Sequence, residues 1–435
     1  MDPAPLRRHV ARSHARTRRE DGIALPMALI VLVVLSTLAA AVLAVGSSET
    51  NISTNHRRAA EALYLAEAGL EAAFAAINAD TSLLTSAPSM LATLAVTAPA
   101  AMLATQGTYA VQYRTVGART VEVVSTGTTS ATALGRGTRT LRALMTNSYS
   151  APDAVRSDRT LQVSGNASIG GACGSIHSNQ GVQFQGSAAT IAVNATATGT
   201  VSTTGTSSPT VGGASISDVP RRPVPTISAS EALTAAETQA KDAYTAGTTV
   251  PTIYRLNGDG TIEQSAVSGS PPVVTYTTIA GPLGNNGTWD NLKYRQPSGP
   301  NPATWEAGLT TGGAAPTISG IFYVTGNLEV KASGPWTATI IATADISVIG
   351  SPTITNVLTD TVLVSGDDID VSGSPTFVEG VVAAHGEIEI SGSPNLTGFL
   401  VSEDTIDISG TPIISFGCGM NPPITTPLTI VAWGF

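Results

Sequence analysis

The first long hydrophobic segment of the chain spans residues 23–45 and contains no charged residue in 23 positions. As a helix it is about 35 Å long, which is enough to cross the hydrocarbon core of a membrane. A secretory signal sequence has a shorter apolar core followed by a small-residue cleavage site. A buried helix of a soluble protein rarely runs this far without a charge. The pattern therefore predicts a transmembrane helix over residues 23–46.

The following segment, residues 56–79, is rich in Ala, Leu and Glu, which are strong helix formers. Its apolar residues recur at steps of three and four, as on one face of an amphipathic helix. This stripe consists of Leu63, Ala66, Leu70, Phe74 and Ile77. Residues 47–80 are therefore predicted to continue the helix beyond the membrane, giving a rod of about 85 Å. Gly46, Ser47 and Ser48 mark the place where such a rod can bend.

Residues 81–150 change to the alternating pattern of strands. Three segments alternate apolar and polar residues and are joined by Gly-rich stretches: residues 108–114, 120–125 and 138–146. This arrangement predicts a small antiparallel sheet, which we expect to pack on the second half of the helix.

Beyond residue 150 the pattern repeats with a period near 20 residues. The clearest copies, each with two Ile or Val residues two positions apart before a Gly-containing corner, are residues 345–352, 368–375, 387–394 and 405–412. Poorer copies occupy residues 161–166, 182–187 and 201–203. A repeat this short holds strands and turns only, so we predict a right-handed β-helix whose Ile and Val side chains stack inside. A β-sandwich with coincidental repeats is the alternative.

The fold class is thus mainly β with a long N-terminal helix. The β-helix is predicted in two blocks, residues 151–205 and 316–435, with about eight coils and a C-terminal strand. Residues 206–315 interrupt the period and are predicted to be an insertion. It contains a Pro-rich linker at 220–225 and a helix at 228–245, opened by a capping box in which Ser228 is followed by Glu231.

The charge of the chain is distributed unevenly. The net charge is −9, yet the first 22 residues hold six of the 22 basic residues against three acids. A basic arm beside a transmembrane helix stays in the cytoplasm, so we expect the bulk of the chain outside it. A solvated basic tail of the kind that binds nucleic acid is the alternative. The remainder is strongly acidic, which argues against general nucleic-acid binding.

The N-terminal segments resemble the prepilin-type proteins. Glu20, Asp21 and Gly22 directly precede Ile23 and the uncharged helix, as in a class III signal. The resemblance implies that residues 1–22 are a leader, that a prepilin peptidase cuts between Gly22 and Ile23, and that the new amine of Ile23 is methylated. Ala66, Glu67, Ala68 and Gly69 are similar to the signature of PilX-type minor pilins.

One residue departs from the family pattern. Major pilins carry a Glu at the fifth mature position, where this chain has Met27. Such a carboxylate is costly in hydrocarbon unless it pairs with a neighbouring subunit's amine. Its replacement by Met favours a minor, tip-proximal subunit over a bulk filament subunit. The repeated region, with residues 176–181 and 380–384, resembles the β-helical bactofilin-like domain that follows some PilX-type N-termini.

Acidic side chains occupy the outward positions of the later coils in two predicted columns. One contains Asp345, Asp368 and Glu387, and the other contains Asp370, Glu389 and Asp407. Oxygen ligands of this kind suit Ca²⁺, so these columns are a candidate cation site. The alternative is a solvated acidic face that protects a sheet surface from aggregation. No other cofactor is expected.

The sequence offers no convincing catalytic constellation. The five His residues are scattered, and there is no Gly-x-Ser-x-Gly, P-loop or Cys-x-x-Cys motif. We therefore predict that the protein is not an enzyme, although a carbohydrate-active site on the acidic columns is a third hypothesis. Cys173 and Cys418 lie on the oxidising side of the membrane. Two alternatives are open for them: a disulfide, or two buried thiols. Blocks stacked end to end would hold the two residues too far apart for a disulfide.

These features give two main hypotheses. The first is a minor pilin in a type IV pilus-like filament, held by its helix among other pilins in the cytoplasmic membrane. Its β-helical part would initiate assembly or adhere to a surface or polysaccharide. The second is an unprocessed β-helical scaffold anchored in the membrane. Cleavage after Gly22 distinguishes them.

Overall fold

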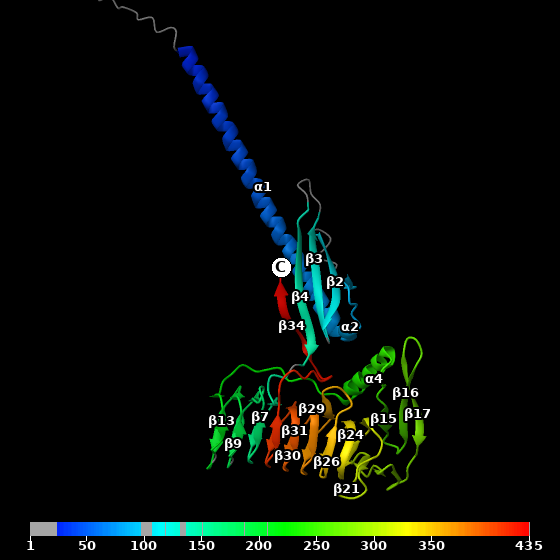
Figure 1. The fold of residues 1–435 in the computed structure, drawn as a ribbon. Coiled ribbons are helices and arrows are strands. Elements are labelled where there is room, and N and C mark those ends of the chain that lie inside the picture. The colour runs from blue at the N-terminus through cyan, green and yellow to red at the C-terminus, as the bar shows by residue number, and fades with distance from the viewer. Residues whose placement is uncertain are drawn as a thin grey trace, which may run out of the picture.

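The computed structural model describes residues 24–96, 107–117, 119–130, 136–149, 151–186, 188–206 and 208–434. Its first element is one uninterrupted helix, α1 (Ala24–Ala79), of 56 residues. The helix projects from a small sheet, and a long β-solenoid lies beyond that sheet (Figure 1). The predicted fold class, a long N-terminal helix followed by a mainly β chain with a solenoid, is confirmed.

The sheet against α1, which we call the head, is antiparallel. Its strand order is β1-β2-β3-β4-β34. The strands are β1 (Ala92–Thr93), β2 (Gly107–Gly117), β3 (Thr120–Thr129), β4 (Thr138–Ser148) and β34 (Thr425–Gly434), and the short helix α2 (Ser82–Thr85) precedes them. The predicted apolar stripe faces this sheet: Ala66, Leu70 and Ile77 are fully buried in the head core, and Leu63 and Phe74 pack at its edge.

The C-terminal strand belongs to the head. The sequence predicts it at the end of the second coil block, but β34 pairs with β4 and completes the sheet beside α1. The chain therefore crosses from the head to the solenoid after β4 and returns before β34. The alternating pattern of this strand does not show whether it pairs with the solenoid or with the head, because an edge strand of either sheet has the same pattern.

The solenoid consists of short strands stacked in parallel. Among the described residues, nine parallel strands form its central ladder, in the order β12-β9-β6-β32-β30-β28-β25-β23-β20. An 18-stranded sheet forms the remaining walls. The predicted inward pairs are buried in every clear repeat: Ile346 and Val348, Ile369 and Val371, Ile388 and Ile390, Ile406 and Ile408.

The strands of the first block are β5 (Val155–Ser157), β6 (Leu161–Val163), β7 (Ser168–Gly170), β8 (Ile176–Ser178), β9 (Val182–Gln185), β10 (Thr190–Ile191), β11 (Ala195–Ala197), β12 (Val201–Thr204), β13 (Thr210–Val211) and β14 (Ser215–Ile216). Those of the second block begin with β15 (Ile253–Leu256), β16 (Ile262–Ser268), β17 (Val273–Ala280), β18 (Thr288–Trp289), β19 (Leu292–Arg295), β20 (Thr304–Ala307), β21 (Gly313–Ala314), β22 (Gly320–Val324), β23 (Asn327–Val330) and β24 (Ala332–Ala342). The last are β25 (Ile346–Val348), β26 (Ser351–Thr355), β27 (Thr361–Ser365), β28 (Ile369–Val371), β29 (Thr376–Ala384), β30 (Ile388–Ile390), β31 (Asn395–Ser402), β32 (Ile406–Ile408) and β33 (Ile413–Ser415).

The repeat glycines stack at one corner of the coil. A Cβ added at Gly373, Gly392 or Gly410 would lie closer than 3.0 Å to the carbonyl oxygen of the glycine one coil earlier. Real Cβ atoms do not approach so closely, so each coil needs glycine at this corner for the backbones to stack. This contact explains the glycine that ends each inward pair in the repeat.

The two blocks do not stack in chain order. The last coil of the second block pairs with the first coil of the first block, through β32 with β6 and β33 with β7. We call this junction the seam. The first block runs from the seam to one end of the solenoid, and the second begins at the other end and returns to the seam (Figure 1). The two blocks thus form one continuous solenoid, in which the second block is the longer part.

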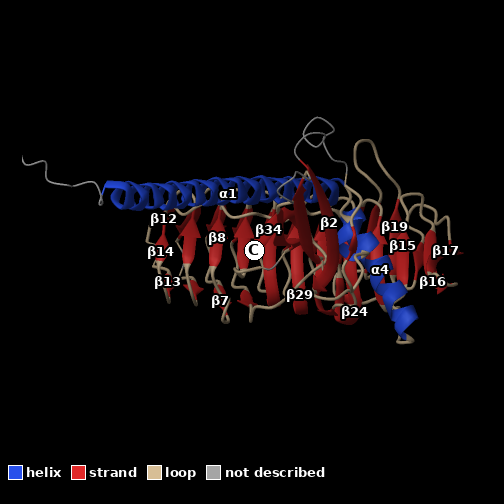
Figure 2. Ribbon diagram, turned by 90° about the horizontal axis from the view of Figure 1, so that it is seen from above, coloured by secondary structure: helices blue, strands red, loops and turns tan. Residues whose placement is uncertain are grey.

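A strap of residues 217–252 connects the two ends. It runs back along the solenoid and contains α4 (Ala229–Ala246), whose strand neighbours include β24 and β27 (Figure 2). The helix begins at Ser228, whose hydroxyl accepts a hydrogen bond from the Glu231 N–H, and ends at the left-handed Gly247. The predicted helix at 228–245 is accurate to one residue at each end.

The predicted insertion at 206–315 is too long. Strands β13 and β14 extend the first block, and β15 and β20 already pair in parallel with β22 and β23 of the second. These coil strands are only two to four residues long, which is too short to show a period. The true departures from the coil are the strap and the antiparallel strands between β15 and β20.

Candidate assembly helix and acidic ladder

The first half of α1 contacts no other part of the described chain. It has a mean hydropathy of 2.9 over its most apolar window, and none of that window is buried. Such a surface is stable only in an apolar environment, and the helix is long enough to cross a membrane. Met27, in place of the family's Glu, is exposed on this half. Gly22 and Ile23, the predicted processing site, lie outside the described residues.

The second half of α1 is held close to the head by two glycines. A Cβ at Gly69 would come within 3.0 Å of the Ser125 hydroxyl on β3. A Cβ at Gly127, also on β3, would come as close to backbone atoms of Ala62 and Ala66 on the helix. The signature residues Ala66 and Gly69 are buried in this contact, whereas Glu67 and Ala68 are partly exposed. The signature therefore has a packing role here.

We expect Gly69→Ala to loosen the helix from the head. The added methyl group must displace Ser125 and the ring of Tyr109, at a cost of about 1–3 kcal/mol in the free energy of unfolding of the head. Gly46→Ala on the same helix is the matched control, because no atom lies within 4 Å of its added Cβ. Urea unfolding of both variants measures the difference. Equal stabilities would show that the close approach is unimportant.

The second predicted column forms a ladder in strict register. Asp370 pairs with Glu389, and Glu389 pairs with Asp407. At one end the ladder passes into Gln162, which donates a hydrogen bond to Asp407 at 3.3 Å, and then Gln183. At the other end, Glu306 is buried among Lys293, Arg295 and Lys331. Within this ladder, the uncompensated acidic charge is thus confined to the three coils before the seam.

The first column is built differently. Three side chains along it accept a hydrogen bond from the backbone of the next coil: Asn327 from the Asp345 N–H at 3.1 Å, Asp345 from the Asp368 N–H at 3.5 Å, and Asp368 from the Glu387 N–H at 2.7 Å. These contacts tie successive coils together. The column therefore has a structural role that the sequence pattern did not reveal.

A third acid joins the first column. One carboxylate oxygen from each of Asp345, Asp367 and Asp368 lies within 4.8 Å of the others. Burial, and then the charges of Asp367 and Asp368, raise the pKa of Asp345. Asp367 was not among the predicted site residues, although the adjacent pair of Asp residues was a visible signal. The arrangement has the oxygen ligands that a hard cation prefers, and it is equally usual in a solvated acidic face.

The acidic ladder makes the stability of the solenoid depend on pH. Burial, and then the charge of Glu389, raise the pKa of Asp370, and the pKa of Asp407 is raised in the same way. These groups bind protons more tightly in the folded state, so their repulsion is relieved as the pH falls through the raised pKa.

We therefore expect Asp370→Asn to raise the melting temperature at pH 7 by about 1–3 °C. The gain should vanish near pH 3, where the carboxyl group is protonated in the folded and unfolded states alike. Glu379→Gln, at an exposed carboxylate on β29, is the control and should change little. Calorimetry across this pH range is the measurement. A gain that persists at pH 3 would contradict the electrostatic cause.

Cys173 and Cys418 are joined as a disulfide, with their Cα atoms 5.3 Å apart. They are close because the seam brings the end of the second block against the start of the first. Coils stacked in chain order would separate the two residues, but the coils do not stack in that order.

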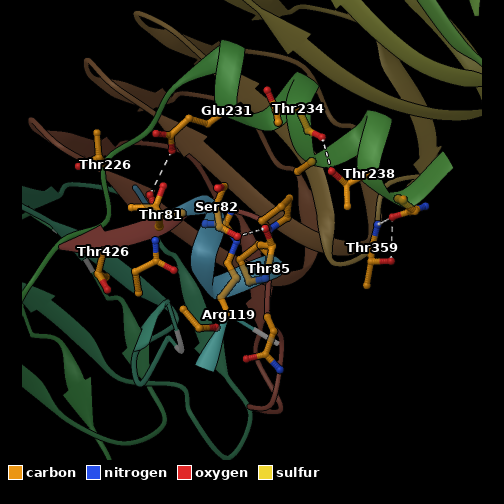
Figure 3. Close-up of a pocket in the computed structure, with 18 of the residues that line it drawn as sticks. Thr81, Ser82, Thr85, Arg119, Thr226, Glu231, Thr234, Thr238, Thr359 and Thr426 are labelled. Carbon is orange, nitrogen blue, oxygen red and sulfur yellow. Dashed lines mark hydrogen bonds between the residues drawn. The ribbon is translucent and has the colours of Figure 1, made fainter. Parts of the chain in front are cut away.

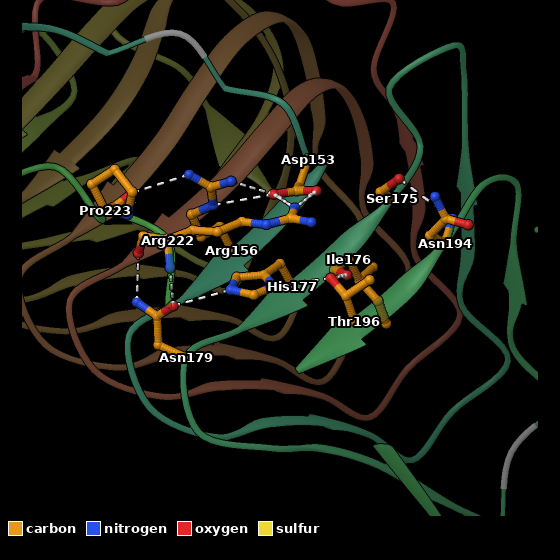
Figure 4. Close-up of polar contacts among 10 residues, drawn as sticks. All are labelled: Asp153, Arg156, Ser175, Ile176, His177, Asn179, Asn194, Thr196, Arg222 and Pro223. Carbon is orange, nitrogen blue, oxygen red and sulfur yellow. Dashed lines mark hydrogen bonds and ion pairs between the residues drawn. The ribbon is translucent and has the colours of Figure 1, made fainter. Parts of the chain in front are cut away.

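A buried polar network lies beside the seam and was not predicted (Figure 4). Asp153 and Arg156 form an ion pair at 2.5 Å, and their side chains are 2% and 3% exposed. Arg156 also donates to the Pro223 carbonyl at 3.0 Å, and Arg222 donates to Asp153 at 3.0 Å. The network therefore fastens the strap to the solenoid, so the predicted Pro-rich linker is an anchored segment.

Asn179 holds the backbone of the strap in the same place. Its side chain accepts from the Arg222 N–H at 2.8 Å and donates to the Arg222 carbonyl at 2.7 Å, as a neighbouring strand would. His177 contacts both Asn179, at 3.0 Å, and Thr196, at 2.9 Å. Burial is the largest cause that lowers the pKa of His177. The neutral ring is thus favoured inside the solenoid.

Comparisons with known proteins give little further information. No protein-family model matches the chain, and no curated protein matches it. Among solved structures, it is similar to the competence-associated pilin ComZ from Thermus thermophilus, with 10% sequence identity and a TM-score of 0.29. That similarity covers 87% of this chain and 97% of the other. A TM-score of this size does not establish a shared fold.

Proposed function

We propose that this protein is a minor pilin-like subunit of a type IV pilus-like filament. The observation that carries the proposal is the division of α1 into two halves. One half is exposed and apolar, with no charge over residues 25–48, and the other packs on an antiparallel sheet through Gly69 and Gly127. A helix of this kind is anchored in the membrane before assembly and packs among other pilin helices afterwards.

The leader and its boundary add the processing step. The resemblance around Gly22 and Ile23 implies cleavage by a prepilin peptidase on the cytoplasmic face, with the head outside. Met27 leaves the subunit without the carboxylate that pairs with the subunit ahead. A subunit at the tip has no subunit ahead of it, so it needs no such carboxylate. We therefore place this protein near the tip of the filament.

The solenoid is then the part that the filament presents. The role we propose for it is structural: it initiates assembly or adheres to a surface, and it is not an enzyme. Its covered core and its continuous stack of coils suit a rigid display platform. The seam disulfide suits the oxidising side of the membrane.

Shearing of filaments from cells tests incorporation. The wild-type protein is expected in the sheared filament fraction, whereas Gly22→Val is expected to stay in the membrane with its leader attached. Glu379→Gln, at an exposed carboxylate of the solenoid strand β29, should behave as the wild type. If the wild type stays in the membrane fraction together with Gly22→Val, the filament proposal fails and the membrane-anchored scaffold is favoured.

A further inference from the structure

A cavity of about 650 Å³ lies at the joint between the head and the solenoid. It is lined by the end of α1 and α2, by Arg119 and Asn147 of the head, by the exposed side of α4, and by the segment that leads into β34. Figure 3 shows hydroxyl-bearing residues from these elements around one space. The volume is that of a site for a small ligand.

The walls of this cavity are fixed to each other. The Thr226 N–H of the strap donates to the carbonyl of Thr425 at 2.8 Å, and Thr425 also pairs with Ser148 of β4. The Thr425 hydroxyl donates to Glu231 on α4 at 3.1 Å. Head, strap and helix are therefore held together at one residue, so the cavity has a defined shape.

The lining of the cavity is rich in hydrogen-bond acceptors. Thr234 and Thr238 on α4 donate their hydroxyl hydrogens to carbonyls one turn back, at 3.0 and 2.8 Å. Their oxygen lone pairs remain available to a ligand. Glu231 and Asp242 add carboxylate oxygens on the same helix. A ligand that fits must therefore donate several hydrogen bonds.

Two residues of the head point to a missing partner. The guanidinium of Arg119 donates no hydrogen bond to any described residue, and burial lowers its pKa although the charge of Glu231 opposes that shift. Asn147 is 3% exposed, and its side-chain oxygen has no hydrogen-bond partner among the described residues. A buried polar atom without a partner costs about 1–3 kcal/mol, which a ligand or water in the cavity would recover.

We propose that this cavity binds a neutral saccharide unit. Sugar hydroxyls both donate and accept, so they suit the threonine and carboxylate acceptors as well as the Arg119 donors. An anionic ligand would meet Glu231 and Asp242, and a cationic one would meet Arg119. Apolar side chains, among them Leu358, Leu428 and Pro422, line part of the cavity and can contact the C–H faces of a sugar ring. The site does not depend on incorporation into a filament.

Saturation-transfer NMR on the full-length chain in detergent micelles tests the site. The probes are glucose, galactose, mannose, N-acetylglucosamine and their β1,4-linked disaccharides, with glucuronate and glucosamine as charged analogues. We expect saturation transfer to at least one neutral sugar and none to the charged analogues. Arg119→Gln should weaken its binding about tenfold, as expected for the loss of a charge-assisted hydrogen bond.

The matched pair of variants locates the site. Thr238→Val removes a hydroxyl that faces the cavity, and Thr245→Val removes one from the same helix outside it. Both threonines are exposed and donate to the carbonyl one turn back, so their folding effects should be equal. We expect weaker binding for Thr238→Val alone. No transfer to any neutral sugar, transfer only to a charged analogue, or equal binding by both variants would overturn the proposal.

Discussion

Replacing Cys173 and Cys418 by Ser should lower the free energy of unfolding of the solenoid by roughly 5 kcal/mol. The disulfide closes a loop of 245 residues, and a loop of this length gives a stabilisation of that size in the chain-entropy model. The effect is large because the ring contains most of both coil blocks and the strap. Without it, the seam is held only by strand pairing and side-chain packing.

Urea unfolding, with and without a thiol reductant, measures this effect. The reductant should shift the wild type to the midpoint of the double Ser variant and should leave that variant unchanged. A variant as stable as the oxidised wild type would show that the seam needs no covalent bond. A reductant effect on the double variant would show that the reagent acts elsewhere.

Replacing Asp153 by Ala should cost about 3–5 kcal/mol in the free energy of unfolding. Arg156 would keep its charge in a site where its side chain is 3% exposed, with its ion-pair partner gone. Arg222 would lose its contact with Asp153 as well. We expect the strap to detach from the solenoid at lower urea concentration than the coils unfold.

Arg221→Ala is the control for this effect. Arg221 pairs with Asp158 nearby, but its side chain is 67% exposed, so the loss should be at most about 1 kcal/mol. Hydrogen exchange of the strap residues separates local detachment from global unfolding. If the two variants are equally stable, the buried pair does not hold the strap.

Much of the fold follows from periodicity in the sequence. The stripe from Leu63 to Ile77 identifies the packed face of α1, and the paired Ile and Val residues identify the coil interior. These signals are strong because a buried face requires apolar residues at a fixed spacing. Ser228 and Gly247 likewise fix the ends of α4 through local hydrogen bonding and backbone conformation.

The order of the coils could not be obtained in this way. Any coil with Ile or Val inside stacks on any other, so the repeat does not specify that β32 meets β6. The seam explains why Cys173 lies close to Cys418. The seam can form only because the strap carries the chain from one end of the solenoid to the other. Asp153 and Arg156 belong to no repeat, which is why the network that anchors the strap was also missed.

The acidic columns were predicted in the correct register, but their chemistry was only partly visible. The pairing of Asp370, Glu389 and Asp407 follows from the repeat spacing. The backbone hydrogen bond that Asp368 accepts depends on side-chain direction, which spacing does not specify. The cavity at the joint involves six separate segments, and no local pattern brings Arg119 and Glu231 together.

The N-terminal residue of the protein purified from its own membrane tests the central claim most directly. Mass spectrometry of the N-terminal peptide measures it, and Gly22→Val provides the uncleaved standard. Our account predicts that the mature chain begins at Ile23 with a free or methylated amine. A chain that begins at Met1 would contradict it, because an uncut leader leaves the helix as a membrane anchor only.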